Sequence, residues 1–96
     1  MKTLSLTNEL ATVAQHVIWF EPPEQALADP IRFVTYAMTY GTHQDMKVVR
    51  LYLSDDDLRE ALTNAPPGIF DPRSWAYWHL KLGQYPPPPL PSRRFP

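Results

Sequence analysis

The sequence predicts an all-α protein, a compact bundle of five short helices that is followed by a polyproline tail. Three observations predict this fold. Apolar residues recur at helical spacing in several segments, and no segment alternates polar and apolar residues for long enough to form a strand. Ser, Thr and Asp residues stand directly before these segments, where they would cap helices. Six of the last eleven residues are proline.

The first helix is predicted from about Thr7 to Ile18. Its apolar residues have i, i+3, i+4, i+7 spacing: Leu10, Val13, Ala14 and Val17. Glu21-Pro22-Pro23 should break this helix, because a residue that precedes proline is pushed out of the α region. We therefore expect Trp19 and Phe20 to lie at a helix end and to pack into the core.

The second helix is predicted over Ile31 to Tyr40, with Asp29 as its N-cap and Pro30 in its first turn. Its broad apolar face predicts a central position in the bundle. Gly41 should stop it in the left-handed conformation that ends many helices. Thr42 then caps a third helix from about His43 to Leu53, and Asp45 completes a capping box.

The fourth helix should begin after Ser54, with Asp55, Asp56 and Asp57 in the first turn, where the helix dipole favours anions. Its buried residues are predicted to be Leu58, Ala61, Leu62 and Ala65. The fifth helix is predicted over Pro72 to Leu82. Asp71 should cap it, Phe70 should act as a hydrophobic staple at its start, and Gly83 should close it.

The chain has 96 residues, which is enough for one domain. We assign residues 1–85 to the helical domain and 86–96 to the tail. The net charge of −1 gives no overall basic field for nucleic acid or membranes. The chain has no cysteine, no signal-peptide pattern and no apolar run long enough to span a bilayer, so we expect a cytoplasmic protein.

Neither a catalytic nor a metal site is expected. Three consecutive helical aspartates, Asp55 to Asp57, point in directions about 100° apart and cannot converge on a cation. The three histidines, His16, His43 and His79, lack the spacing of zinc ligands. The sequence has no phosphate-binding glycine loop and no nucleophile with a base. We therefore predict a protein that is not an enzyme and has no cofactor.

The predicted partner-binding residues are Trp75, Trp78, Leu90 and Arg93. The two tryptophans are three positions apart on one helix, and polyproline segments dock on aromatic faces. The tail should pack on its own tryptophan face, with His79 at the edge, or dock on another subunit. Residues 88–93 also match the Pro-x-x-Pro-x-Arg form of SH3 ligands, a pattern that arises easily by chance.

Two alternatives remain open. The second to fourth helices would form a helix-turn-helix that binds DNA through Lys47 and Arg50, although the acidic start of the fourth helix disfavours it. In the other alternative, the protein is a stand-alone helical domain, and its tail only stabilises its own fold. The identity of a partner and the oligomeric state, a homodimer included, are not determined by the sequence.

The chain resembles a family of small bacterial proteins encoded beside nucleotidyltransferase-fold toxins of the abortive-infection type. Three segments carry the resemblance: Val17-Ile18-Trp19-Phe20, Thr39-Tyr40-Gly41-Thr42-His43-Gln44-Asp45 and Ser74-Trp75-Ala76-Tyr77-Trp78. They span roughly residues 17 to 83. The resemblance implies a non-enzymatic role as an antitoxin or accessory subunit that binds a nucleotidyltransferase-like toxin.

Overall fold

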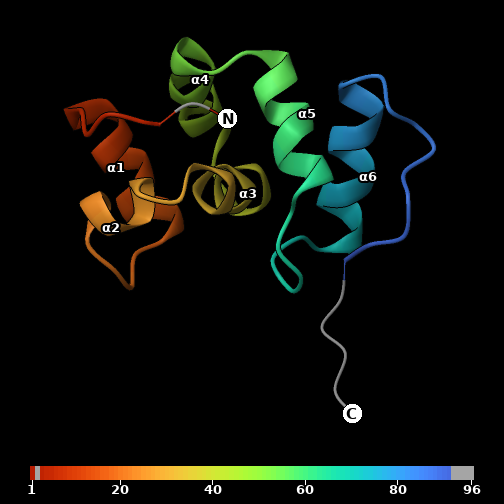
Figure 1. Ribbon diagram of the computed structural model, residues 1–96, viewed down its shortest axis with the longest axis horizontal. Coiled ribbons are helices and arrows are strands. Elements are labelled where there is room, and N and C mark those ends of the chain that lie inside the picture. Colours follow the sequence, from red (N-terminus) through yellow and green to blue (C-terminus); the bar gives the residue numbers. More distant parts are fainter. Residues whose placement is uncertain (2, 92–96) are drawn as a thin grey trace.

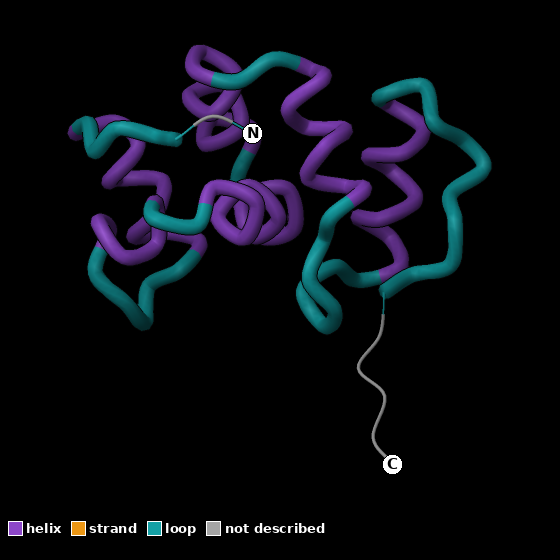
Figure 2. Tube along the Cα trace, in the orientation of Figure 1, coloured by secondary structure: helices purple, strands orange, loops and turns teal. Residues whose placement is uncertain are grey.

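The computed structural model describes residues 1 and 3–91, and all of the regular secondary structure in these residues is helical (Figures 1 and 2). The all-α prediction is confirmed, with six helices in place of five. Their bounds are α1 Asn8–Val17, α2 Pro23–Leu27, α3 Pro30–Tyr40, α4 His43–Tyr52, α5 Asp55–Thr63 and α6 Pro72–Lys81.

Helix α3 is the centre of the bundle, as its broad apolar face predicted. It packs against each of the other five helices, and Figure 1 shows α1 and α2 on one side of it and α5 and α6 on the other. Phe33, Val34 and Ala37 of α3 are completely buried. A helix that is apolar on several sides can fill the middle of a bundle because each side finds a partner.

The predicted caps fix the helix starts. Thr42 and Asp45 form a reciprocal capping box at α4, and Ser54 and Asp57 form a second one at α5. At α6, the Asp71 side chain accepts a hydrogen bond from the backbone of Ser74. Each cap gives a partner to backbone N–H groups that would otherwise have none.

The hydrophobic staple predicted at the start of α6 is also present. The rings of Phe70 and Trp75 meet edge to face, with their centroids 5.2 Å apart. These residues occupy the N′ and N4 positions of the helix, so their contact sets the angle at which the chain enters α6.

Helix α2 was not predicted. Pro22-Pro23 ends the α1 region as expected, but Pro23 also occupies the first position of a new helix of five residues. Proline suits that position because its fixed φ is already helical and its missing N–H would have had no partner. The helix has no side-chain cap and only five residues, so neither a capping residue nor a repeated apolar spacing marked it in the sequence.

The prediction for Trp19 and Phe20 was wrong. Their exposed fractions are 77% and 52%, whereas Ile18 is completely buried. Ile18 continues the apolar face of α1 four positions after Ala14, and it takes the core position. The chain then leaves the helix, and the next two side chains lie outside.

The prediction for Gly41 was also wrong in its mechanism. Gly41 does end α3, but its φ is −72°, which is not left-handed. A Cβ atom at this position would lie 2.5 Å from the carbonyl oxygen of Ala37, so close packing explains the glycine. Gly83, after α6, does have the expected left-handed conformation, with a φ of 77°.

Candidate binding site

A groove of about 620 Å³ lies between α4 and α6, and the end of α3 contributes to its lining. We call it the α4–α6 groove. Its two walls present residues at i, i+3, i+4, i+7 spacing on each helix. From α4 these are His43, Met46, Lys47 and Arg50; from α6 they are Ser74, Tyr77, Trp78 and Lys81, with Arg73 beside them. Met38, Gly41 and Thr42 complete the lining.

Both walls are held in place through α3. The Nε1 of Trp78 donates a hydrogen bond to the carbonyl oxygen of Met38 over 2.8 Å. Trp78 is only 5% exposed, so this bond satisfies an indole N–H that has little access to water. On the other wall, the Thr42 capping box fixes the first turn of α4 directly after α3. The groove is thus bounded by well-anchored elements.

The groove collects most of the cationic side chains that the structure describes. Six Lys and Arg residues lie in the described part of the chain, and four of them line the groove: Lys47, Arg50, Arg73 and Lys81. No Asp or Glu is among the lining residues. The groove is therefore a basic site on a chain whose overall charge is slightly negative.

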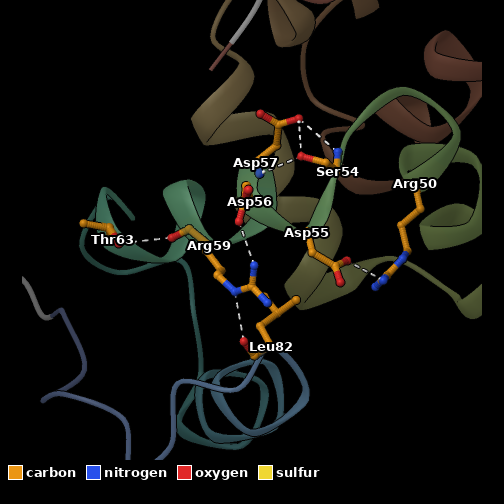
Figure 3. Close-up of polar contacts among 8 residues, drawn as sticks. All are labelled: Arg50, Ser54, Asp55, Asp56, Asp57, Arg59, Thr63 and Leu82. Atoms are coloured by element: carbon orange, nitrogen blue, oxygen red, sulfur yellow. Dashed lines mark hydrogen bonds and ion pairs between the residues drawn. The ribbon is translucent and has the colours of Figure 1, made fainter.

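The two remaining described cations are bound elsewhere. Arg32 pairs with Glu21 at 2.5 Å. Arg59 bonds to Asp56 and to the carbonyl oxygen of Leu82, as Figure 3 shows.

Within the groove, Arg50 pairs with Asp55 at 2.5 Å (Figure 3), and the Lys81 ammonium lies 6.0 Å from the centre of the Tyr77 ring. Among the described residues, Lys47 and Arg73 have no ion-pair partner.

The three aspartates at the start of α5 bind three different partners. Asp55 pairs with Arg50, Asp56 with Arg59, and Asp57 accepts the backbone N–H of Ser54 (Figure 3). Their carboxylates diverge, as the helical geometry predicted. Within residues 1 and 3–91, no group of three or more His, Asp or Glu side chains is placed to hold a metal ion.

Asp45 is a buried acid directly behind the groove lining, with 5% of its surface exposed. Its Oδ2 accepts the Thr42 N–H over 3.0 Å, and its Oδ1 lies 3.0 Å from Nδ1 of His16 on α1. Burial acts to raise the pKa of Asp45, but the Thr42 N–H and the His16 contact together outweigh it and hold this pKa below its usual value. The ionised carboxylate thereby ties α4 to α1.

Trp75, another predicted binding residue, is on α6 but is not among the residues that line this groove. Trp75 is 4% exposed, and its Nε1 donates to the carbonyl oxygen of Pro88 over 2.8 Å. Leu90 is half-buried against the core. Figure 2 shows the loop after α6 running back beside this helix. A second cavity, of about 510 Å³, lies between this segment and α6, and its lining includes Trp75, His79 and Pro88.

His79 has the structural position that was expected at the edge of the tail. It is 3% exposed, its ring centroid lies 4.2 Å from that of Trp75, and its Nδ1 lies 2.7 Å from the Trp75 carbonyl oxygen. The contact with its own helix backbone gives a buried imidazole a hydrogen-bond partner.

An aromatic cluster is the third surface feature. Trp19, Phe20 and Tyr40 are exposed, and Tyr36 is half-buried between Phe20 and Tyr40. Successive ring centroids lie 5.6, 6.0 and 5.9 Å apart. The Arg32 guanidinium lies 5.3 Å from the centre of the Tyr36 ring. Its hydrogen bond to Glu21, against a smaller effect of burial, raises the pKa of Arg32 further above an already high value, so the group is always charged.

The predicted partner-binding residues thus fall into two places. Trp78 lies in the α4–α6 groove together with Lys47 and Arg50, the two residues of the DNA-binding alternative. Trp75 lies under the tail segment and Leu90 lies within it, and Arg93 lies outside the described residues.

The α4–α6 groove as a unit was not predicted from the sequence. The sequence does place cations at helical spacing within residues 43–50 and within residues 73–81. These two sets form one site only when the two helices are placed side by side.

None of the helices in the described residues has the length and apolar character needed to cross a bilayer. Comparison of the chain with protein-family models, with curated proteins and with solved structures finds no match.

Proposed function

We propose that this protein is a non-enzymatic interaction module that binds a protein partner through the α4–α6 groove. The observation that carries the proposal is the concentration of basic side chains around an apolar lining. Met38, Met46 and Trp78 provide apolar surface, and Lys47 and Arg73 provide charges without an ion-pair partner among the described residues. Apolar anchors surrounded by charge are typical of protein interfaces.

The partner proposed is a nucleotidyltransferase-like toxin, for which the protein would act as an antitoxin or accessory subunit. The resemblance supports this role, because two of the segments that carry it contribute to the groove. Gly41 and Thr42 belong to the segment of residues 39–45, and Ser74, Tyr77 and Trp78 belong to the segment of residues 74–78. If the chain and the family it resembles share these residues because they bind the toxin, the residues should line the binding site.

The test is co-expression with a nucleotidyltransferase-fold enzyme encoded beside the gene. We expect a stoichiometric complex on size-exclusion chromatography and relief of growth inhibition. The double variant Lys47→Gln/Arg73→Gln should weaken both. The matched control is Gln15→Glu/Gln25→Glu, which changes the net charge equally at exposed positions on α1 and α2. Equal behaviour of the two variants would contradict the groove as the binding surface, and absence of any complex would contradict the partner.

DNA binding remains the second candidate, and one observation favours it: Lys47 and Arg50 share the groove with Arg73 and Lys81. Four cations on one surface are a sufficient electrostatic footprint for phosphates. Against it, Arg50 is already paired with Asp55. If the protein binds DNA, the logarithm of its affinity for a duplex oligonucleotide should fall linearly with the logarithm of the salt concentration, with a shallower slope after Lys47→Gln.

A further inference from the structure

The α4–α6 groove has the chemistry and geometry to hold one more helix. We propose that its occupant is an amphipathic α-helix of the partner, in which apolar anchors are flanked by Asp and Glu side chains. The inference rests on the proposed function and specifies the partner's recognition element. Binding of such a helix to the groove can be tested with a short peptide, without the whole partner.

The geometry favours a helix over an extended chain. Each wall is a single helix of ten residues, and each presents its lining residues at i, i+3, i+4, i+7 spacing over its length. A ten-residue helix is about 15 Å long, so the groove matches about three turns of a ligand helix. Both walls pack more extensively against α3 than against each other, and the groove lies in the space between them. Helix-in-groove recognition uses this arrangement, with anchors at the same spacing.

The apolar part of the groove determines what the anchors must be. Met38, Met46 and Trp78 are more than nine-tenths buried, and Tyr77 on the wall is 52% exposed. Methionine side chains adapt their shape to the group that packs on them. Leu, Met or Phe anchors on the ligand helix would therefore find a deformable apolar lining with one aromatic wall.

The charges determine what must flank those anchors. Lys47 and Arg50 lie on one wall, and Arg73 and Lys81 lie on the other. A helix between them faces cations on both sides, so Asp or Glu on both edges of its apolar stripe would complete the pairing. A basic or neutral helix would leave Lys47 and Arg73, which have no ion-pair partner among the described residues, partly desolvated without a counter-charge, and this disfavours it.

Nucleic acid is less well matched to this surface. A phosphate backbone would pair with the four cations, but it would gain nothing from the methionine and tryptophan lining. An acidic amphipathic helix uses both the apolar and the basic parts of the groove.

The experiment is fluorescence anisotropy with the full-length protein and a labelled peptide of about fifteen residues. The peptide carries Leu at i, i+3, i+4 and i+7, flanked by Glu. Two control peptides are required: one in which the same residues are scrambled to destroy the helical periodicity, and one in which every Glu is Gln. We expect binding in the micromolar range, weakened at least about tenfold in both controls.

The protein offers its own matched variants. Lys47→Gln/Arg73→Gln should weaken peptide binding about tenfold, whereas Gln15→Glu/Gln25→Glu should leave it within about twofold. Methyl NMR of methionine then locates the site. Of the three methionines, Met38 and Met46 line the groove, and Met1 pairs through its amino group with Glu60. Saturation with the peptide should shift the methyl signals of Met38 and Met46 and leave that of Met1 unchanged.

Several outcomes would overturn the inference. Equal binding of the scrambled peptide would show that the occupant need not be a helix. Equal binding of the Gln peptide would show that its acidic residues are not needed. Tighter binding of a duplex oligonucleotide than of the peptide, with the same methionine shifts, would assign the groove to nucleic acid. Shifts of Met38 and Met46 on raising the protein concentration alone would assign it to a second copy. If no peptide binds but the co-expressed enzyme still forms a complex that survives Lys47→Gln/Arg73→Gln, the interaction function stands and the groove is not its site.

Discussion

The indole Nε1 of Trp75 donates a hydrogen bond to the carbonyl oxygen of Pro88 over 2.8 Å, and this bond fastens the segment after α6 to the helix itself. The bond spans thirteen positions in the sequence, and Trp75 is only 4% exposed. It gives the tail a structural role in its own domain, which is compatible with either a stand-alone or a partner-bound protein.

Trp75→Phe should therefore lower the free energy of unfolding by about 1 to 2 kcal/mol, because the ring is kept but the donor to Pro88 is lost. Thermal or urea unfolding followed by circular dichroism measures this. In a chain truncated after Gln84, the same substitution should have a much smaller effect, since its acceptor is gone. An undiminished effect in the truncated chain would show that the bond to Pro88 is not what stabilises Trp75.

Asp45→Asn should lower stability at neutral pH by about 1 to 2 kcal/mol, since the charged carboxylate is the acceptor for Thr42 and the partner of His16. Because the folded-state pKa of Asp45 is below its unfolded value, this stabilisation is complete above about pH 5. It is lost as the pH falls through about 4 toward the folded-state pKa.

The difference between the native chain and Asp45→Asn should thus shrink on acidification. Urea unfolding at a series of pH values from about 7 to 3 measures it. An exposed acid without such contacts provides the control: Glu24→Gln on α2 should give a difference near zero at every pH. A gap for Asp45→Asn that stays constant down to the lowest pH would contradict the assignment.

Gly41→Ala should destabilise the protein by about 2 kcal/mol or more, because the added Cβ would lie 2.5 Å from the backbone oxygen of Ala37. At Gly83 the requirement is the left-handed φ and not space, since no atom lies within 4 Å of an added Cβ. Gly83→Asn should therefore cost little, because Asn tolerates that conformation. Chemical denaturation of both variants measures the contrast, and a larger cost at Gly83 would contradict it.

Trp19 should account for the quenchable part of the tryptophan fluorescence. It is 77% exposed, whereas Trp75 and Trp78 are 4% and 5% exposed. Acrylamide titration of the native chain should show one accessible and one protected population. Trp19→Phe should remove the accessible population and change the unfolding free energy by less than about 0.5 kcal/mol. Strong quenching that persists in this variant would mean that the tail does not cover Trp75 in solution.

Several parts of the fold could be read from the sequence because their causes are local. A capping box needs only two residues three positions apart, so Thr42 with Asp45 identified the start of α4. Ser54 was predicted as the cap of α5, and its reciprocal bonding with Asp57 was found only in the structure. Helical spacing of apolar residues predicted the buried residues of α1 and, apart from the half-buried Ala65, those of α5. The prediction missed α2 because a proline can either end a helix or begin one. Pro23 follows the end of the α1 region and is also the first residue of α2.

The sequence by itself determined where most helices begin and which of their faces are buried, since capping and periodicity act within a few residues. Only the tertiary structure decided which charged and aromatic side chains share a surface. Lys47 and Arg73 are 26 positions apart and belong to two helices that both pack against α3, and His16 reaches Asp45 from another helix. Such contacts depend on the packing angles of whole helices, which are the sum of many small interactions spread over the core and carry no signal in any one segment.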